Sequence, residues 1–240
     1  MEPKSISIAA DTPIKGKREP VETRIYREFH RAIAERRLAP GTKLVEDTLA
    51  HVFKTSRARI RKVLLVLAQE NVVRLEPNRG AFVCKPSADE ARQAVEARRA
   101  IELHLVREAA KKAKHTTIQR LRKLIDAERT AIERGDHERI LHLSGEFHVV
   151  VAEATDNRIL VNFLRELVSR CYLILATYER RDNSTCPQAD HAGIVDLIEG
   201  GNVEGAAEAM DLHFDHMMEA LDLASRSRER QDLYEVFRSA

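Results

Sequence analysis

The 240-residue sequence has no long apolar run: no stretch approaches the roughly 18 uncharged apolar residues that indicate a membrane helix. Its first 20 residues also lack the apolar core and the small-residue cleavage site of a secretion signal. We therefore expect neither a membrane span nor export. Apolar residues still make up 43% of the chain and charged residues 32%, which predicts a soluble, cytoplasmic protein with a hydrophobic core.

Cysteine is scarce as well, with Cys84, Cys171 and Cys186 as its three occurrences. This odd number lacks the paired spacing of metal-binding cysteines, so reduced and unpaired thiols are expected. A Gly-rich nucleotide-binding loop is missing, and so is a recognisable Ser/His/Asp set. These absences argue against the most familiar nucleotide-dependent and hydrolytic enzymes.

Positive charge is concentrated in the first third of the chain. Residues 1–85 contain 18 Lys+Arg against 10 Asp+Glu, whereas residues 86–240 contain 22 against 28. The net charge of +2 therefore combines a basic part of +8 with an acidic part of −6. This asymmetry predicts two modules, of which the first faces a polyanion.

The basic part predicts three helices. Apolar residues every four positions from Val21 onward indicate a first helix, which ends at LAPG, residues 38–41. A short helix over residues 46–53 follows, and Thr55 or Ser56 then caps a third helix. The buried stripe of this third helix is predicted to consist of Ile60, Val63, Leu64 and Leu67.

Two short β-type runs, residues 72–76 and 81–85, flank the turn PNRG and indicate a hairpin. Three helices followed by a hairpin are the layout of a winged helix-turn-helix. Beyond it, helical periodicity predominates, with breaks that leave about six helices. We therefore predict a mainly α protein with a flexible tail at residues 1–20, a winged helix-turn-helix at 21–85, a linker at 86–88, an all-helical bundle at 89–226 and a C-terminal tail at 227–240.

The third helix carries an unusual density of cations at its N-terminal end. Since the apolar stripe faces inward, the cations point to solvent, where DNA phosphates would neutralise them and an arginine can bind guanine O6 and N7 with two hydrogen bonds. The alternative is a merely solvated basic face. The short helix before it, the cap, the hairpin and the local charge favour DNA. The candidate DNA-binding residues are Ser56, Arg57, Arg59, Arg61, Lys62, Arg79 and Gly80.

This first module resembles the DNA-binding domain of GntR-type bacterial transcription regulators. The matching pieces are Pro40-Gly41, Leu44, Glu46, Leu49-Ala50, Ser56-Arg57, Ile60-Arg61, Leu64, Leu67 and Arg79-Gly80. The resemblance implies that Arg57 and Arg61 contact an operator and that the tip of the wing reaches the minor groove. Arg59 stands where the family commonly has proline, and Lys62 where it commonly has glutamate. The operator sequence therefore cannot be copied from relatives.

Three histidines of the second module, His148, His191 and His213, are each predicted to lie on a different helix. Imidazoles from several helices can converge in a bundle core, and this ligand suits Zn, Ni, Fe and Cu. Their spacing is too long to be diagnostic, however. From the residues alone, ordinary surface or hydrogen-bonded core histidines remain an open alternative.

Residues 89–226 resemble the all-helical ligand-binding (FCD-like) domain of FadR-type GntR regulators. The matching pieces are EARRAIE at 96–102, FH at 147–148, Asn157, DH at 190–191 and AM…H at 209–213. Many members hold a divalent metal, Zn, Ni or similar, with three histidines and an aspartate. The resemblance assigns the histidines to His148, His191 and His213, whereas Ser144 occupies the aspartate position. It also makes Arg98, Ser144 and Asn157 candidate effector-binding residues.

The resemblance and the residues together predict a homodimeric DNA-binding regulator, a repressor in the usual polarity, whose operator affinity responds to a small acid. Three alternatives stay open. The first is a direct metal sensor, and the second is a regulator that binds an organic ligand without metal. The third is a metal-dependent hydrolase in which Glu146 or Asp190 acts as general base. The last alternative leaves the DNA-binding module without a purpose.

Overall fold

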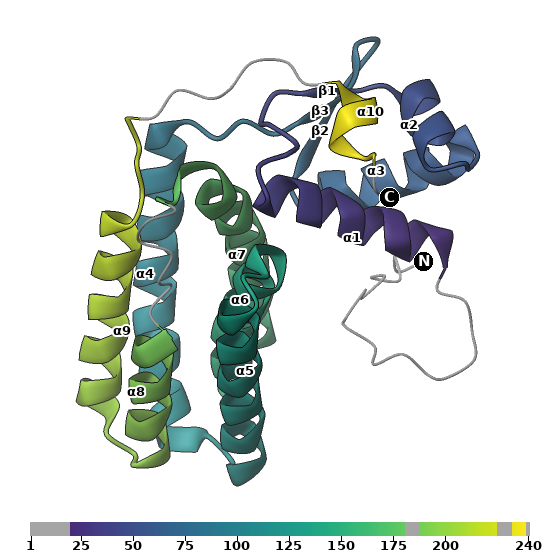
Figure 1. Ribbon diagram of the computed structural model, residues 1–240. Coiled ribbons are helices and arrows are strands. Elements are labelled where there is room, and N and C mark those ends of the chain that lie inside the picture. Colours follow the sequence, from purple (N-terminus) through teal and green to yellow (C-terminus); the bar gives the residue numbers. More distant parts are fainter. Residues whose placement is uncertain (1–19, 181–187, 225–231, 239–240) are drawn as a thin grey trace.

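The computed structural model describes residues 20–180, 188–224 and 232–238, which fold into a small α/β unit and a bundle of long helices (Figure 1). The tail predicted for residues 1–20, apart from Pro20, and the cysteine at position 186 lie outside this part. Cys84 and Cys171 are free thiols, as expected. Among the described residues, no helix combines the length and apolar character that crossing a membrane requires.

The N-terminal unit is a winged helix, which confirms the predicted fold. Its sheet has the strand order β1-β3-β2, with antiparallel neighbours. The strand β1 is only two residues long, too short for any periodicity to predict it. The elements are α1 (Val21–Ala34), β1 (Lys43–Leu44), α2 (Glu46–Val52), α3 (Arg57–Gln69), β2 (Val73–Glu76) and β3 (Gly80–Val83).

The third helix, α3, begins where the sequence predicts. The Ser56 side chain accepts a hydrogen bond from the backbone N–H of Arg59 and so caps the helix. The four residues of the predicted stripe are 0–3% exposed. The wing that follows turns through Asn78 and Gly80, both at positive φ, a conformation that asparagine and glycine tolerate best. The opposite face of α3 is consequently left for solvent or a partner.

Six helices form the second unit, as predicted. They are α4 (Ala88–Lys112), α5 (His115–Glu133), α6 (His137–Glu153), α7 (Arg158–Tyr178), α8 (Gln188–Glu199) and α9 (Val203–Glu219). Ser87 and Glu90 form a reciprocal capping box that starts α4 directly after the wing. Gly145 allows α6 and α7 to approach closely, because a Cβ at this position would lie 2.8 Å from a methyl group of Val168.

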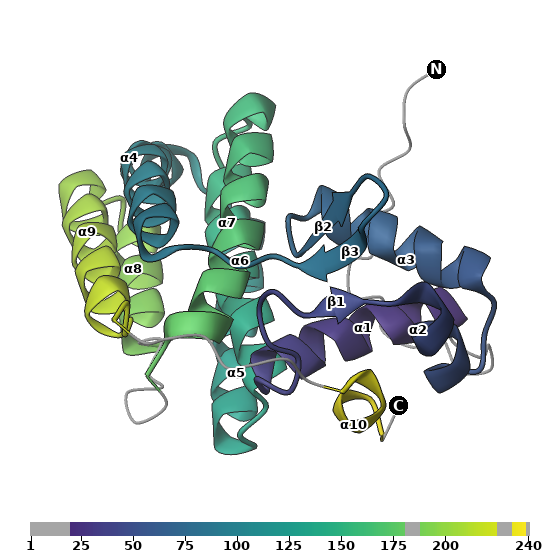
Figure 2. The same cartoon turned by 90° about the horizontal axis from the view of Figure 1, so that it is seen from above.

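One hydrophobic cluster spans both units, beside a separate core within the bundle. Leu141 of α6 and Leu173 and Ala176 of α7 are buried in the same cluster as the core of the winged helix. Figure 2 shows α7 between the winged helix and the helices α4, α8 and α9. The predicted linker at 86–88 is therefore not the only connection, and the Tyr178 hydroxyl even bonds to the carbonyl of Pro86, at 2.7 Å.

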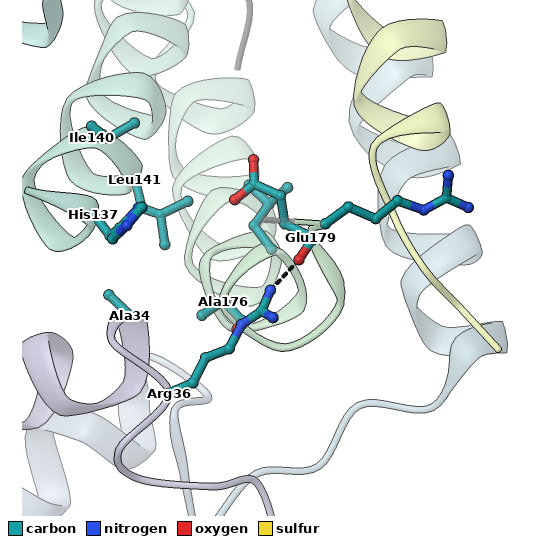
Figure 3. A pocket seen from close by; sticks show the side chains of 9 residues that line it. Ala34, Arg36, His137, Ile140, Leu141, Ala176 and Glu179 are labelled. Atoms are coloured by element: carbon teal, nitrogen blue, oxygen red, sulfur yellow. Dashed lines mark hydrogen bonds between the residues drawn. The ribbon is translucent and has the colours of Figure 1, made fainter. Parts of the chain in front are cut away.

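Polar contacts reinforce this junction. From α7, Tyr172 Oη donates to the carbonyl of His30 (2.9 Å) and Ser169 Oγ to that of Glu70 (2.6 Å). In the other direction, Arg36 reaches from the end of α1 to the C-terminal carbonyls of α7, those of Ala176 and Glu179 (Figure 3). A cation at this end of a helix also complements the helix dipole. The position of α7 is thus coupled to that of the winged helix.

The predicted C-terminal tail is wrong for residues 232–238. This segment forms a short helix, α10 (Leu233–Val236), beside α2 (Figure 1). Phe237 is 1% exposed, and its ring lies 5.1 Å from those of Phe29 and Phe53. Leu233, Val236 and Phe237 are too few to show a helical periodicity in this polar stretch. They nevertheless pack into the core of the winged helix, which lies some 150 residues earlier in the sequence.

Candidate nucleic-acid interface and metal site

The predicted DNA-binding cations lie together on the solvent face of α3. The side chains of Arg57, Arg59 and Arg61 are 61%, 51% and 64% exposed, and Lys62 is exposed beside them. They project from the first half of the second helix of a helix-turn-helix, the part that enters the major groove in such motifs. The geometry therefore suits a duplex groove.

Each of these arginines has an acidic neighbour on another helix. Two of the acids, Glu46 and Asp47, are the first residues of α2, and Glu22 belongs to α1. The contact distances are 2.7 Å for Arg61–Glu46, 3.0 Å for Arg57–Asp47 and 3.9 Å for Arg59–Glu22. These acids were not predicted to take part, because they are distant in sequence from α3. They offset part of the repulsion among the like charges of α3.

The tip of the wing adds a further cation. Arg79 is 72% exposed on its side chain and pairs with Glu76 across the turn. Its guanidinium also lies over the ring of Phe82, 5.6 Å from the centroid. Gly80 follows at φ +97°, where a side chain would be strained. The wing thus presents Arg79 on the compact turn that the motif predicts.

The three predicted histidines converge at the centre of the bundle. His148 comes from α6, His191 from α8 and His213 from α9, and their exposures are 2%, 0% and 1%. Each offers a ring nitrogen within 4.8 Å of those of the other two. Phe147 stacks on the His191 ring at 4.1 Å. Sequence spacing could not establish this convergence, which requires the packing of three helices.

A carboxylate lies behind each imidazole. Glu102 Oε2 lies 2.5 Å from His148 Nδ1, and Asp190 Oδ2 lies 3.5 Å from His213 Nδ1. His191 Nδ1 donates to Glu128 Oε2 at 3.0 Å. Such carboxylates orient metal-binding histidines and fix their tautomers. Glu128 of α5 was missed entirely, since nothing local in the sequence of an amphipathic helix distinguishes it from a surface glutamate.

Burial keeps His148 and His213 neutral. Desolvation lowers the pKa of His148 to about 3 and that of His213 to about 4, although the adjacent carboxylates oppose the shift. Burial alone would raise the pKa of Glu102, but Arg98 and His148 outweigh it and lower the pKa to about 2. At neutral pH the imidazoles of His148 and His213 are consequently neutral, the form that binds metal, and Glu102 beside them is ionised.

The donor set fits a divalent metal. Nε2 of His191 is buried and has no hydrogen-bond partner among the described residues, and a lone pair in such a place is costly unless something coordinates it. Ser144 is 5% exposed one helical turn before His148, where a carboxylate would otherwise stand. Three imidazoles without a fourth protein carboxylate leave open positions on the metal.

Arg98 lies next to this site and is 2% exposed. Its Nε donates to Glu102 Oε1 at 2.7 Å, so the glutamate connects Arg98 to His148. The Nη2 atom of Arg98 is buried without a hydrogen-bond partner in the described part of the chain. The Cys171 thiol of α7 also faces Arg98. Burial raises the pKa of this thiol, and the charge of Arg98 opposes the rise. A buried guanidinium donor of this kind suits an anionic acceptor.

Asn157 and Glu146 have partners elsewhere, whereas Asp190 contacts both His213 and His216. The Asn157 side chain is exposed and caps α7 by accepting from the N–H of Leu160 at 3.2 Å, so it is not gathered with the histidines. Glu146, one of the two bases considered for a hydrolase, pairs instead with Arg120 at 2.5 Å. Asp190 accepts from the half-buried His216 at 2.8 Å.

Two family profiles match this combination of modules. "Bacterial regulatory proteins, gntR family" matches residues 22–83, and "FCD domain" matches residues 93–216, more than half of the chain. The chain is a GntR-family transcription regulator with an FCD domain. The matched ranges coincide with the winged helix and the six-helix bundle, which confirms the resemblance seen in the sequence.

Relatives support the same assignment for this GntR-family regulator. It is 26% identical over 206 residues to the HTH-type transcriptional repressor RspR of Escherichia coli (strain K12), covering 85% of this chain and 90% of RspR. Over 239 residues it is 26% identical to the HTH-type transcriptional repressor NanR of Cronobacter sakazakii (strain ATCC BAA-894), covering 88% and 90%. The regulator is therefore a DNA-binding protein of transcriptional control.

Solved structures share its fold. A putative transcriptional regulator GntR from Rhodococcus sp. RHA1 superposes with a TM-score of 0.70 at 21% identity, covering 85% of this chain and 99% of the other. E. coli McbR/YncC gives a TM-score of 0.67 at 17% identity, covering 84% and 97%. At such identities the likeness concerns the fold alone.

Proposed function

We propose that this regulator represses transcription by binding an operator as a homodimer, with α3 in the major groove and the wing at the adjacent minor groove. The exposed cations of α3 support this placement, with Arg57, Arg61 and Lys62 as contacts and Arg79 at the wing. One α3 covers only a half-site, so two copies are needed to read paired half-sites. Repression rather than activation is supported by the relatives RspR and NanR, which are both repressors.

The bundle is the sensor in this proposal. His148, His191 and His213 would hold a divalent metal, with Glu102, Glu128 and Asp190 orienting their rings. Bound there, the metal supplies Lewis-acid positions that accept oxygen ligands. The observation that supports it most directly is the fully buried Nε2 of His191, which has no hydrogen-bond partner within the described ranges.

The effector would be a small carboxylic acid. Its carboxylate suits the open donor of Arg98 on one side and the metal on the other, and Ser144 offers a hydroxyl nearby. Glu102 already pairs with Arg98 at 2.7 Å, so the argument for an acid rests on the open Nη2 donor, for which a carboxylate is a stronger acceptor than a neutral group. Asn157 is left out of this proposal because its side chain already caps α7.

Metal content and operator binding test the sensor together. We expect His191→Ala to copurify with less zinc or nickel than the wild type and to lose the effect of a dicarboxylate such as succinate or citrate on operator affinity. His216→Ala is the matched control, because His216 shares Asp190 with His213 but is 40% exposed and outside the triad. Equal metal stoichiometry in the wild type and His191→Ala would contradict the metal site.

Measuring operator affinity with metal and acid added separately distinguishes the alternatives. If zinc or nickel alone changes operator affinity and no acid adds to the effect, the protein is a direct metal sensor. If acids act equally on protein treated with chelator, the bundle binds them without metal. A hydrolase is disfavoured, since Glu146 is held by Arg120 and Asp190 by His216.

A further inference from the structure

One ion pair on the DNA-binding surface differs from its neighbours in geometry. Arg61 of α3 donates twice to Glu46 of α2, from Nε to Oε1 at 2.9 Å and from Nη2 to Oε2 at 2.7 Å. Glu46 is only 24% exposed on its side chain, whereas Arg61 is 64% exposed. The hydrogen bonds from Arg61 also lower the pKa of Glu46. The less mobile partner is therefore the acid, and it is ionised at neutral pH.

This arrangement occupies one edge of the guanidinium and leaves another open. Arginine has five N–H groups in a planar fork. Glu46 takes the side edge, formed by Nε and one hydrogen of Nη2. The end edge, formed by Nη1 and the second hydrogen of Nη2, has no partner among the described residues. Two parallel N–H groups on one edge are what guanine O6 and N7 accept, so Arg61 can hold Glu46 and a guanine together.

The other arginines of α3 are not fixed in this way. Arg57 meets Asp47 through one contact at 3.0 Å, and both side chains are more than 60% exposed. Arg59 lies 3.9 Å from Glu22. A single or long contact restricts the direction of an arginine side chain little. Arg57 and Arg59 are therefore suited to contacting phosphates. The two-point contact is confined to Arg61 among the arginines of α3.

We propose that Glu46 is a specificity-determining positioning residue: it holds the Arg61 guanidinium so that its open edge faces a guanine in the major groove. The inference rests on the proposed function, in which Arg61 contacts the operator. A carboxylate near DNA repels phosphates and lowers affinity for every sequence. Its benefit is that the arginine is oriented before it binds, so that less side-chain freedom is lost on the correct base.

Two variants separate orientation from charge. Glu46→Gln removes the charge at nearly constant shape, whereas Glu46→Asp keeps the charge but is too short for the same two contacts. If Glu46 orients Arg61, both variants lose discrimination. If Glu46 only screens charge, Glu46→Asp behaves as the wild type, and Glu46→Gln binds all DNA more tightly by one common factor. Asp47→Asn is the matched control on the adjacent, single-contact pair.

The experiment uses the full chain and a duplex site selected from a random-sequence library with the wild type. Affinities are measured for that site, for versions with each guanine pair replaced by adenine, and for unrelated DNA. Arg61→Ala identifies the guanine that Arg61 reads. At that position, we expect Glu46→Gln and Glu46→Asp each to reduce discrimination by about tenfold while affinity for unrelated DNA does not fall. Asp47→Asn should leave the discrimination unchanged.

Two results would overturn the inference, and they are distinguishable. Full discrimination by Glu46→Asp at the guanine that Arg61→Ala identifies would mean that Arg61 reads the base without Glu46. No position-specific loss in Arg61→Ala would instead refute the base contact itself, and with it the proposed placement of α3. Equal thermal unfolding temperatures for all four variants exclude misfolding as the cause of either result.

Discussion

At the scale of single residues, Ser144 is the departure with the largest expected consequence. It is 5% exposed in the core of α6, one turn before His148, at the position where the resemblance places a metal-binding aspartate. A hydroxyl here adds no charge when the metal is absent. Serine at this position therefore adds no further buried anion to a site that already contains Glu102.

Substituting Ser144 by Asp should add both a buried negative charge and a metal ligand at this position. Without metal, a buried carboxylate with no cation should lower the free energy of unfolding by about 1–3 kcal/mol. With zinc, it should bind as a fourth protein ligand and tighten metal binding by about tenfold or more. Thermal unfolding in chelator and in excess zinc measures both effects. Ser144→Asn, of equal size but neutral, is the control, and equal zinc affinity of the two variants would show that this position does not face the metal.

Residue types revealed part of the site, but not all of it. The histidines and Arg98 could be predicted because their types and their resemblance to a family pointed to ligand chemistry. Glu128 could not, because only the packing of α5 against α8 brings it to His191. Likewise, the pairing of Glu46 with Arg61 joins two helices across 15 positions of sequence. Such partners depend on tertiary contacts that no local pattern contains.

At the scale of elements, periodicity identified the long helices, but short elements required the fold. The two-residue strand β1 pairs with β3 only because the wing is already there. The helix α10 and the residue that follows it contribute just Leu233, Val236 and Phe237 as buried residues, too few for a periodic signal. Both elements are stabilised by contacts with distant segments rather than by their own propensity.

The helix α10 leads to a prediction about stability. Replacing Phe237 by Ala removes a ring that packs between Phe29 and Phe53, and the cavity should cost the winged helix about 3–5 kcal/mol. Hydrogen exchange of amides in α1 and α2 should therefore accelerate more than that of α4 or α5. Tyr234→Ala, whose side chain is largely exposed, is the control and should cost less than about 1 kcal/mol. Unchanged exchange in α1 and α2 would contradict the packing.

At the scale of the whole molecule, α7 is the element that contacts both the sensor and the DNA-binding unit. One of its faces brings Cys171 to Arg98 and buries Ile174 in the bundle core. The other face packs Leu173 and Ala176 into the core of the winged helix. A ligand that moved Arg98 would thus act on a helix that contacts α1 and the residue that follows α3, Glu70. A flexible linker at residues 86–88 is not needed for such coupling.

The hydroxyls of Tyr172 and Ser169 allow this coupling to be tested directly. Each donates to a backbone carbonyl of the winged helix, and each bond contributes about 0.5–1.5 kcal/mol. In the double variant Tyr172→Phe, Ser169→Ala, the ratio of operator dissociation constants with and without metal and acid should fall toward 1, from the roughly 5–150-fold typical of allosteric coupling. Metal affinity itself should stay within about threefold of the wild type, because neither hydroxyl reaches the histidines.

Thr177→Ala provides the control for that experiment, because the Thr177 hydroxyl is also on α7 but bonds within the helix, to the carbonyl of Leu173. It removes a hydroxyl of the same helix without touching the junction, so the ratio of operator dissociation constants should remain as in the wild type. If the double variant also keeps the wild-type ratio, α7 transmits nothing through these bonds. The signal would then have to pass through the shared apolar core or through the strand that leads from the wing into α4.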